Sequence, residues 1–259
     1  MSIIQSVILG LVQGLTEFLP ISSSGHLVLL QKLLGVKGAV LTFDVLVHFG
    51  TLAAVLAVFW QDIVSLLRRP WQKLGLLIIV ATIPTGIIGL SLKDFFERLF
   101  ESGKTLGLEF IVTGLVIWFA DRVRQRSKGI NDISYFDAAF VGVMQGIAIL
   151  PAVSRSGLTI AGSLFRGIDR ETAAKFSFLV SIPAILGATL LDLKDVLGQG
   201  VPPGMGLPFV IGPVVAAISG YWAIKYMIKV LQKGSMKGFA YYVWILGVLV
   251  IALQFTGRL

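Results

Sequence analysis

The stretch TEFLPISSSGHL, residues 16–27, places a glutamate, a proline, three serines and a histidine inside an otherwise apolar region. The chain has 259 residues, of which 56% are hydrophobic and 14% charged, and its mean hydropathy is +0.88. Several apolar runs approach the ~20 residues needed to cross a ~30 Å hydrocarbon layer. These features predict an all-α polytopic membrane protein in which the polar stretch does more than cross the membrane.

Charge and cysteine content narrow the classes of function. The chain has no cysteine, which excludes disulfides, thiol catalysis and thiolate metal sites. Its net charge of +8 comes from Lys and Arg residues that, outside membrane spans, usually report orientation and attraction to anionic lipids. Their distribution does not indicate a nucleic-acid surface, so we expect membrane lipids and no nucleic acid as partners.

Six segments are apolar enough to cross a membrane. They are residues 41–60, 73–92, 105–120, 174–191, 206–228 and 238–257. Two other apolar regions are broken. Residues 2–19 end at Pro20 and are followed by 22–35, and residues 134–150 end at Pro151 and are followed by 154–167. Each break predicts a pair of short helices rather than one span.

The two broken regions are copies of one another. At a constant offset of 132, identical residues recur as Gly10 and Gly142, Gln13 and Gln145, Gly14 and Gly146, Ser22 and Ser154, Ser24 and Ser156, and Gly25 and Gly157. We therefore expect a single membrane domain built from two internal repeats, approximately 1–128 and 133–257.

The charges of the connections predict the topology. Residues 61–73, 121–132 and 229–237 carry an excess of Lys and Arg, whereas 92–105 are balanced and 192–205 slightly acidic. The basic connections should be cytoplasmic. The spans then alternate consistently only if both broken segments are re-entrant. With three spans per repeat, the second repeat is inverted, so the fold is an inverted repeat with six transmembrane helices and two re-entrant helix pairs whose tips meet.

The re-entrant tips predict an anion site. Half-helices that begin at Ser22 and Ser154 direct free N–H groups and positive dipole ends toward the same place. The candidate phosphate-binding residues are Ser22, Ser24, Ser154, Ser156 and Gly157. Helix capping alone also explains Ser22 and Ser24. Arg155 strengthens the anion hypothesis, because a guanidinium at membrane depth needs a partner and its planar fork suits phosphate or carboxylate.

The two tips differ in chemistry. Glu17, Ser23 and His26 of the first tip stand opposite Ile149, Arg155 and Leu158. Ser23 and His26 are three residues apart, so we expect them to share a helix face, close enough for proton transfer. With Arg155, and with Glu17 as a tentative metal ligand, this set fits phosphoryl transfer. The alternatives are that Ser23 only caps its helix and that His26 only satisfies a hydrogen bond.

Other polar residues lie nearby in the sequence. Asp44 and His48, four residues apart, either line the way into the site or pair with each other, and we expect them to support the catalytic residues from behind. Gln13 belongs to the same supporting group. Glu109 is expected at the outer membrane interface.

Four motifs resemble the undecaprenyl-diphosphatase family, also called the BacA-type bacitracin-resistance proteins. They are QGLTEFLPISSSGH (13–26), FDVLVHFGTLAAV (43–55), PAVSRSGLTI (151–160) and AAKFSFLVSIPAILGAT (173–189). The resemblance implies a membrane phosphatase that converts undecaprenyl diphosphate to undecaprenyl phosphate and so recycles the lipid carrier for cell-wall synthesis. By motif position, it implies catalytic roles for Glu17, Ser23, His26 and Arg155.

The resemblance also implies a cofactor, an oligomeric state and a location. These are a divalent cation, Mg²⁺ or Ca²⁺, a homodimer, and the bacterial cytoplasmic (inner) membrane with the active site on its outer side. Two positions depart from the family pattern, since Gln13 stands where many members have a second glutamate and Ala152 where a glycine is common. Whether Ser23 forms a covalent intermediate or orients a water is left open by the motif.

Transport is the competing class of function. Inverted repeats with broken helices at the membrane midplane are typical of secondary transporters. A lipid-phosphate flippase would use the same arginine and helix termini but would need no nucleophile. Ser23 and His26 therefore favour catalysis.

Overall fold

The computed structural model describes residues 1–36, 40–123, 127–199 and 206–257, with side chains omitted from 192 to 199. Within these ranges all regular elements are helices, apart from one isolated bridge between Lys128 and Ile168. The helices are α1 (Ile3–Phe18), α2 (Ser23–Leu33), α3 (Val40–Val58), α4 (Trp60–Arg68), α5 (Lys73–Ser91), α6 (Lys93–Ser102), α7 (Leu106–Asp121), α8 (Tyr135–Ile147), α9 (Arg155–Phe165), α10 (Arg170–Gln199), α11 (Gly206–Lys233) and α12 (Lys237–Phe255), with a 3-10 turn at Ile130–Asp132.

The expected all-α polytopic membrane fold is confirmed. In the described ranges, five helices are long and apolar enough to cross a membrane, namely α3, α5, the first part of α10, α11 and α12. The sixth expected span corresponds to α7, which has 16 residues and reaches spanning length only together with α6. These two helices meet at an angle of 112°, which is typical of a broken span or of a re-entrant loop.

Two connections are themselves helical. α4 lies between the first two spans, and α6 lies where the sequence suggested a plain connection. Both are amphipathic, since apolar residues recur three and four positions apart, as in Trp60, Ile63 and Leu67 of α4. Trp60 and Leu67 are exposed, which is the pattern of a helix that lies along a membrane surface.

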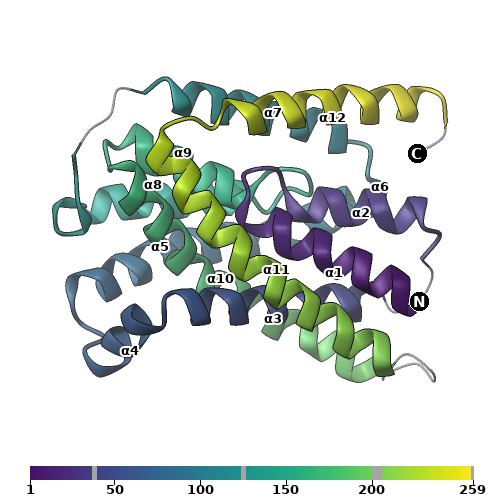
Figure 1. Ribbon diagram of the computed structural model, residues 1–259, viewed down its shortest axis with the longest axis horizontal. Coiled ribbons are helices and arrows are strands. Elements are labelled where there is room, and N and C mark those ends of the chain that lie inside the picture. Colours follow the sequence, from purple (N-terminus) through teal and green to yellow (C-terminus); the bar gives the residue numbers. More distant parts are fainter. Residues whose placement is uncertain (37–39, 124–126, 200–205, 258–259) are drawn as a thin grey trace.

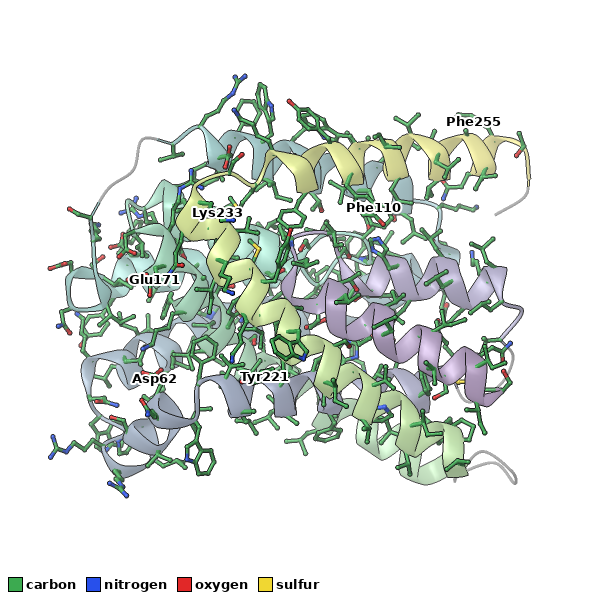
Figure 2. All side chains as sticks on the ribbon, viewed as in Figure 1. Asp62, Phe110, Glu171, Tyr221, Lys233 and Phe255 are labelled. Carbon is green, nitrogen blue, oxygen red and sulfur yellow. The ribbon has the colours of Figure 1, made fainter. Side chains whose placement is uncertain are left out.

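The two broken regions form two pairs of short helices, α1 with α2 and α8 with α9. Their members have 11 to 16 residues, and at ~1.5 Å per residue they are too short to cross the hydrocarbon layer. In Figure 1 the α1–α2 pair extends into the molecule from the side that carries the N label, and the α8–α9 pair extends into it from the opposite side. Figure 2 places Lys233 and Asp62 on that opposite side, far from Phe255.

The packing follows the offset of the repeat. Ser2 and Gln5 form a capping box at the start of α1, and Ser134 and Asp137 form the same box at the start of α8. Gly10 packs on the carbonyl of Gly212 in α11, while its counterpart in α8 packs on a carbonyl of α5. Each re-entrant pair is thus seated on a span of the other half. The repeat boundaries 1–128 and 133–257 stay a prediction.

The contact between α8 and α5 gives a stability prediction. A Cβ at Gly142 would collide with the backbone carbonyl of Ala81, which cannot retreat because it belongs to a helix. We expect Gly142→Ala to lower the melting temperature in detergent, since overpacking costs roughly 1–3 kcal/mol. The control is Gly86→Ala in α5, where a Cβ meets open space. Equal melting temperatures for the two variants would contradict this packing.

Candidate active site

The first tip is held by an unusual backbone at Ser22. α1 ends at Phe18, and Ser22 caps α2 by accepting a hydrogen bond from the N–H of Gly25 at 3.4 Å. Among the described residues, Ser22 is the only non-glycine residue with positive φ, at 67°. Its hydroxyl also donates to the carbonyl of Pro151 at 3.1 Å. A strained conformation that is held by the surrounding structure is typical of functional sites.

The second tip, in the other half of the molecule, is held by hydrogen bonds of Ser154 and Ser156. Ser154 caps α9 by accepting from the N–H of Gly157 at 3.1 Å, and Ser156 donates to the carbonyl of Leu19 at 3.0 Å. With the bond from Ser22 to Pro151, hydrogen bonds therefore cross between the tips in both directions. The expected meeting of the tips is confirmed, and of the two serines for which capping was the alternative, Ser22 is the N-cap of α2.

Glu109 supports the second tip, and its expected place at the outer membrane interface stays a prediction. Its side chain is buried, and its carboxylate accepts the N–H of Ala152 at 2.6 Å. Beside it, Thr113 donates to the carbonyl of Ala152 and accepts the N–H of Ser154, both at 3.1 Å. The glutamate side chain replaces the helical acceptor that the broken backbone lacks.

Glu17 is the centre of the site. Its Oε1 accepts a hydrogen bond from Nη2 of Arg155 at 2.6 Å, and its Oε2 accepts from the Ser23 hydroxyl and, at 3.0 Å, from the Gln13 amide. Nε2 of His48 lies 3.9 Å from Oε2. Helices α1, α2, α3 and α9 thus bring together five of the residues that the sequence selected.

Two polar atoms beside Glu17 are left free. Within the part of the chain that the structure describes, Nη1 of Arg155 and Oε1 of Gln13 are buried and have no hydrogen-bond partner. A buried donor or acceptor without a partner costs free energy. Nη1 can therefore bind an oxygen of an anion while Nη2 keeps its bond to Glu17.

Ser23 and His26 do not form the expected pair. The Ser23 hydroxyl bonds to Glu17, whereas His26 bonds to the Ser22 carbonyl through Nδ1 at 2.6 Å and to the Tyr242 hydroxyl through Nε2 at 2.8 Å. Three residues rotate a helix by about 300°, so neighbouring side chains still diverge by about 60°. Ser23 faces α1, and His26 faces α12. Glu17, rather than His26, is placed to accept the proton of Ser23.

Asp44 and His48 do not pair through their side chains. The Asp44 carboxylate accepts from the Gln31 amide at 2.6 Å, and Nδ1 of His48 lies 2.7 Å from the Asp44 backbone carbonyl. This arrangement turns Nε2 of His48 toward Glu17. The side chains of His48 and Arg155 are 27% and 15% exposed, against 6% for Glu17. The site is therefore most open on the side of His48 and Arg155.

The remaining predicted residues occupy the first turns of the two half-helices. Ser24 is partly exposed in the first turn of α2, and Gly157 packs closely on Ser154 and Pro20. The first amides of a helix have no intrahelical acceptor, so both turns present N–H groups. No pattern in the sequence marks Tyr242, because it is one aromatic residue among several in an apolar span.

A divalent cation has few protein ligands here. Among the described residues, no group of three His, Asp or Glu side chains is placed to hold a metal ion. Glu17 and the free Oε1 of Gln13 are two neighbouring oxygen donors. This set fits Mg²⁺, which is usually held by one or two carboxylates together with phosphate oxygens.

Comparisons with known proteins agree with the motifs. The family described as "Bacitracin resistance protein BacA" matches residues 6–249. A protein of Carboxydothermus hydrogenoformans named undecaprenyl-diphosphatase is 57% identical over 260 residues and covers 100% of both chains. A protein of the same name from Halothermothrix orenii is 48% identical over 98% of both chains, and undecaprenyl-diphosphatase 4 of Bacillus cereus is 47% identical over 99% of both. The chain therefore belongs to the BacA family of bacitracin resistance proteins.

Proposed function

We propose that this protein is a membrane phosphatase that hydrolyses undecaprenyl diphosphate to undecaprenyl phosphate and inorganic phosphate. Its relatives are named for this activity. The observation that carries the proposal is the hydrogen bond from Ser23 to Glu17 beside an arginine whose Nη1 is free. It joins a nucleophile, a base and a phosphate ligand in one buried site. A flippase needs neither a nucleophile nor a base.

In the proposed reaction, Nη1 of Arg155 and the first amides of α2 and α9 bind the terminal phosphate. The Ser23 oxygen attacks the terminal phosphorus while its proton passes to Glu17. The bond from phosphorus to the bridging oxygen breaks, and undecaprenyl phosphate leaves. Water then attacks the phosphorus of the serine phosphate, the bond to the Ser23 oxygen breaks, and Glu17 returns its proton to that oxygen, so that inorganic phosphate is released and the hydroxyl is restored. The positive charges stabilise the phosphoryl oxygens throughout.

Mg²⁺ or Ca²⁺ is the proposed cofactor. Glu17 and Gln13 would hold it together with oxygens of the substrate. The cation would neutralise phosphate charge as the bond to the leaving group breaks. Gln13 would take part through Oε1, which has no hydrogen-bond partner among the residues that the structure describes.

The proposed location is the bacterial inner membrane, with the site reached from the outer side. The basic connection before α12, which includes Lys233, lies opposite the α1–α2 pair and should be cytoplasmic. A homodimer, as the resemblance implies, is the proposed assembly, and light scattering of the detergent complex measures it.

Phosphate release in detergent tests the function. Purified protein is mixed with a C55 or shorter polyprenyl diphosphate and Mg²⁺, and inorganic phosphate is measured. Because no membrane separates two sides, an enzyme turns over in this assay and a pure flippase does not. Failure to release phosphate from either substrate would reject the proposal.

The metal proposal predicts opposite effects of two substitutions. Glu17→Gln is expected to lower the rate and to raise the Mg²⁺ concentration for half-maximal activity at least about tenfold, because it removes the carboxylate ligand. Gln13→Glu adds a carboxylate beside Glu17 and should lower that concentration. Both are read from Mg²⁺ titrations of phosphate release.

Asp94→Asn in the exposed first turn of α6 is the control for loss of a negative charge. If the rate of Glu17→Gln falls while its Mg²⁺ titration matches that of the wild type, Glu17 acts only in proton transfer. The metal would then be held by the substrate alone.

A further inference from the structure

Both ring nitrogens of His26 have partners. Nδ1 faces the carbonyl oxygen of Ser22, which only accepts hydrogen bonds, so Nδ1 carries a proton. In the neutral imidazole, Nε2 is then an acceptor, and the Tyr242 hydroxyl donates to it at 2.8 Å. The two contacts together specify one tautomer of a buried histidine.

The plane of the ring is fixed as well. Tyr242 stacks on His26 with an angle of 10° between the rings and 5.7 Å between their centroids. Phe110 meets the same imidazole edge-on, at 83° and 5.5 Å. Because His26 is 8% exposed, it has little room to turn. Tyr242 therefore contributes a hydrogen bond and a stacking surface at once.

Ser22 has the complementary task. Ser22 has a positive φ, and its carbonyl oxygen lies 2.6 Å from Nδ1 of His26. Its hydroxyl donates to the carbonyl of Pro151 in the other half of the molecule. Holding a non-glycine residue in this conformation costs free energy. The fold bears this cost at the residue that sets the protonated nitrogen of His26, which points to a role for the imidazole beyond packing.

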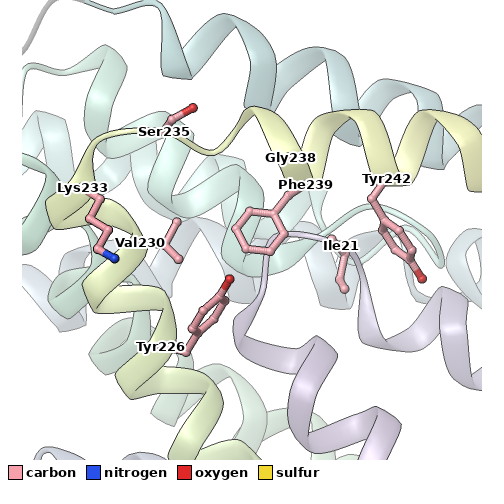
Figure 3. Close-up of a pocket in the computed structure, with 8 residues that line it drawn as sticks. All are labelled: Ile21, Tyr226, Val230, Lys233, Ser235, Gly238, Phe239 and Tyr242. Atoms are coloured by element: carbon pink, nitrogen blue, oxygen red, sulfur yellow. The ribbon is translucent and has the colours of Figure 1, made fainter.

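Tyr242 also forms the wall between His26 and a groove. The groove has a volume of about 570 Å³ and is lined by Ile21, Tyr226, Val230, Lys233, Ser235, Gly238, Phe239 and Tyr242. Figure 3 shows Lys233 at one end and Tyr242 at the other. Tyr242 is 45% exposed, so its ring separates the buried imidazole from the open groove.

We propose that Tyr242 is a positioning residue for the phosphatase reaction, which holds His26 in one orientation by donating its hydroxyl to Nε2 and stacking on the ring. The inference rests on the proposed function, in which the first amides of α2 bind the phosphate, because His26 in turn donates from Nδ1 to the Ser22 carbonyl at the start of that helix. The Tyr242 hydroxyl is the donor that Nε2 faces. Without it, Nε2 has no donor and the ring is less well held.

Tyr242→Phe tests this role, because it removes the hydroxyl and keeps an aromatic ring. We expect kcat to fall about three- to tenfold, as for the loss of one hydrogen bond, with KM within about twofold of the wild type. The matched control is Tyr241→Phe, the preceding residue of α12, whose ring packs on Trp244. This control should leave both constants unchanged.

A spectroscopic measurement separates positioning from general stability. The chain has two histidines, His26 and His48, so ¹⁵N-histidine labelling gives two imidazoles, which His48→Asn assigns. In Tyr242→Phe we expect the Nε2 resonance of His26 to move while its Nδ1 stays protonated. The Tyr241→Phe spectrum should match the wild type.

Either of two results overturns the proposal: an unchanged Nε2 resonance in Tyr242→Phe, or a moved resonance with unchanged kcat. A wild-type protein that releases no phosphate contradicts the proposed function instead. The NMR comparison still decides in that case whether the Tyr242 hydroxyl holds Nε2.

Discussion

Ser23→Ala is expected to lower kcat by at least about 10²-fold while KM stays close to that of the wild type. The substitution removes the hydroxyl that bonds to Glu17, which is the proposed nucleophile, and it leaves in place the amides that are proposed to bind phosphate. The measurement is phosphate release in detergent at saturating Mg²⁺, with kcat and KM determined separately.

Ser24→Ala is the control for Ser23→Ala. Ser24 is the next residue in the same turn and is partly exposed, so its replacement should leave kcat within a few-fold of the wild type. A Ser23→Ala enzyme with comparable activity would show that Ser23 only caps or packs. The double variant Ser23→Ala/Glu17→Gln should be little worse than the poorer single variant, because residues that act as one unit are not additive.

The fold was predictable because two physical constraints act along the sequence itself. Apolar length fixes what crosses the membrane, and the bias of Lys and Arg fixes the side of each connection. If both broken segments are re-entrant, an odd number of spans per repeat makes them enter from opposite sides, so that their tips point toward each other. The hydrogen bonds from Ser22 to Pro151 and from Ser156 to Leu19 are the result.

Which residues lie together at the two tips was largely predictable, but part of their hydrogen bonding was not. Spacing along one helix shows that Ser23 and His26 are neighbours, but it does not show which helix each of them faces. His26 is held by a residue 216 positions away in α12, and no local pattern marks Tyr242 for that contact. The contact of Glu109 could not be predicted for a similar reason, since its partner is a backbone amide of the other half.

The expected effect of Arg155→Lys is a loss of activity comparable to that of Ser23→Ala, in a protein that still folds. Lysine keeps the positive charge and can replace the bond to Glu17. It cannot bind Glu17 and a phosphate oxygen with two nitrogens of one planar group, as Nη2 and the free Nη1 of arginine can. Arg155→Ala should be worse still, because it leaves the buried carboxylate of Glu17 without its cation.

The rival hypothesis is that Arg155 only joins the two tips through its ion pair with Glu17, and a matched arginine distinguishes the two. Arg166 at the end of α9 donates from Nε to the buried Asp137 at 2.6 Å, outside the site, so Arg166→Lys weakens a purely structural pair. Melting temperature and specific activity are measured on the same purified samples of both variants. If Arg155 binds phosphate, Arg155→Lys melts near the wild-type temperature and is inactive, whereas Arg166→Lys loses stability and keeps its specific activity. An Arg155→Lys protein that behaves like Arg166→Lys would leave Arg155 with a structural role alone, and the phosphate would have to be bound by the helix termini and the metal.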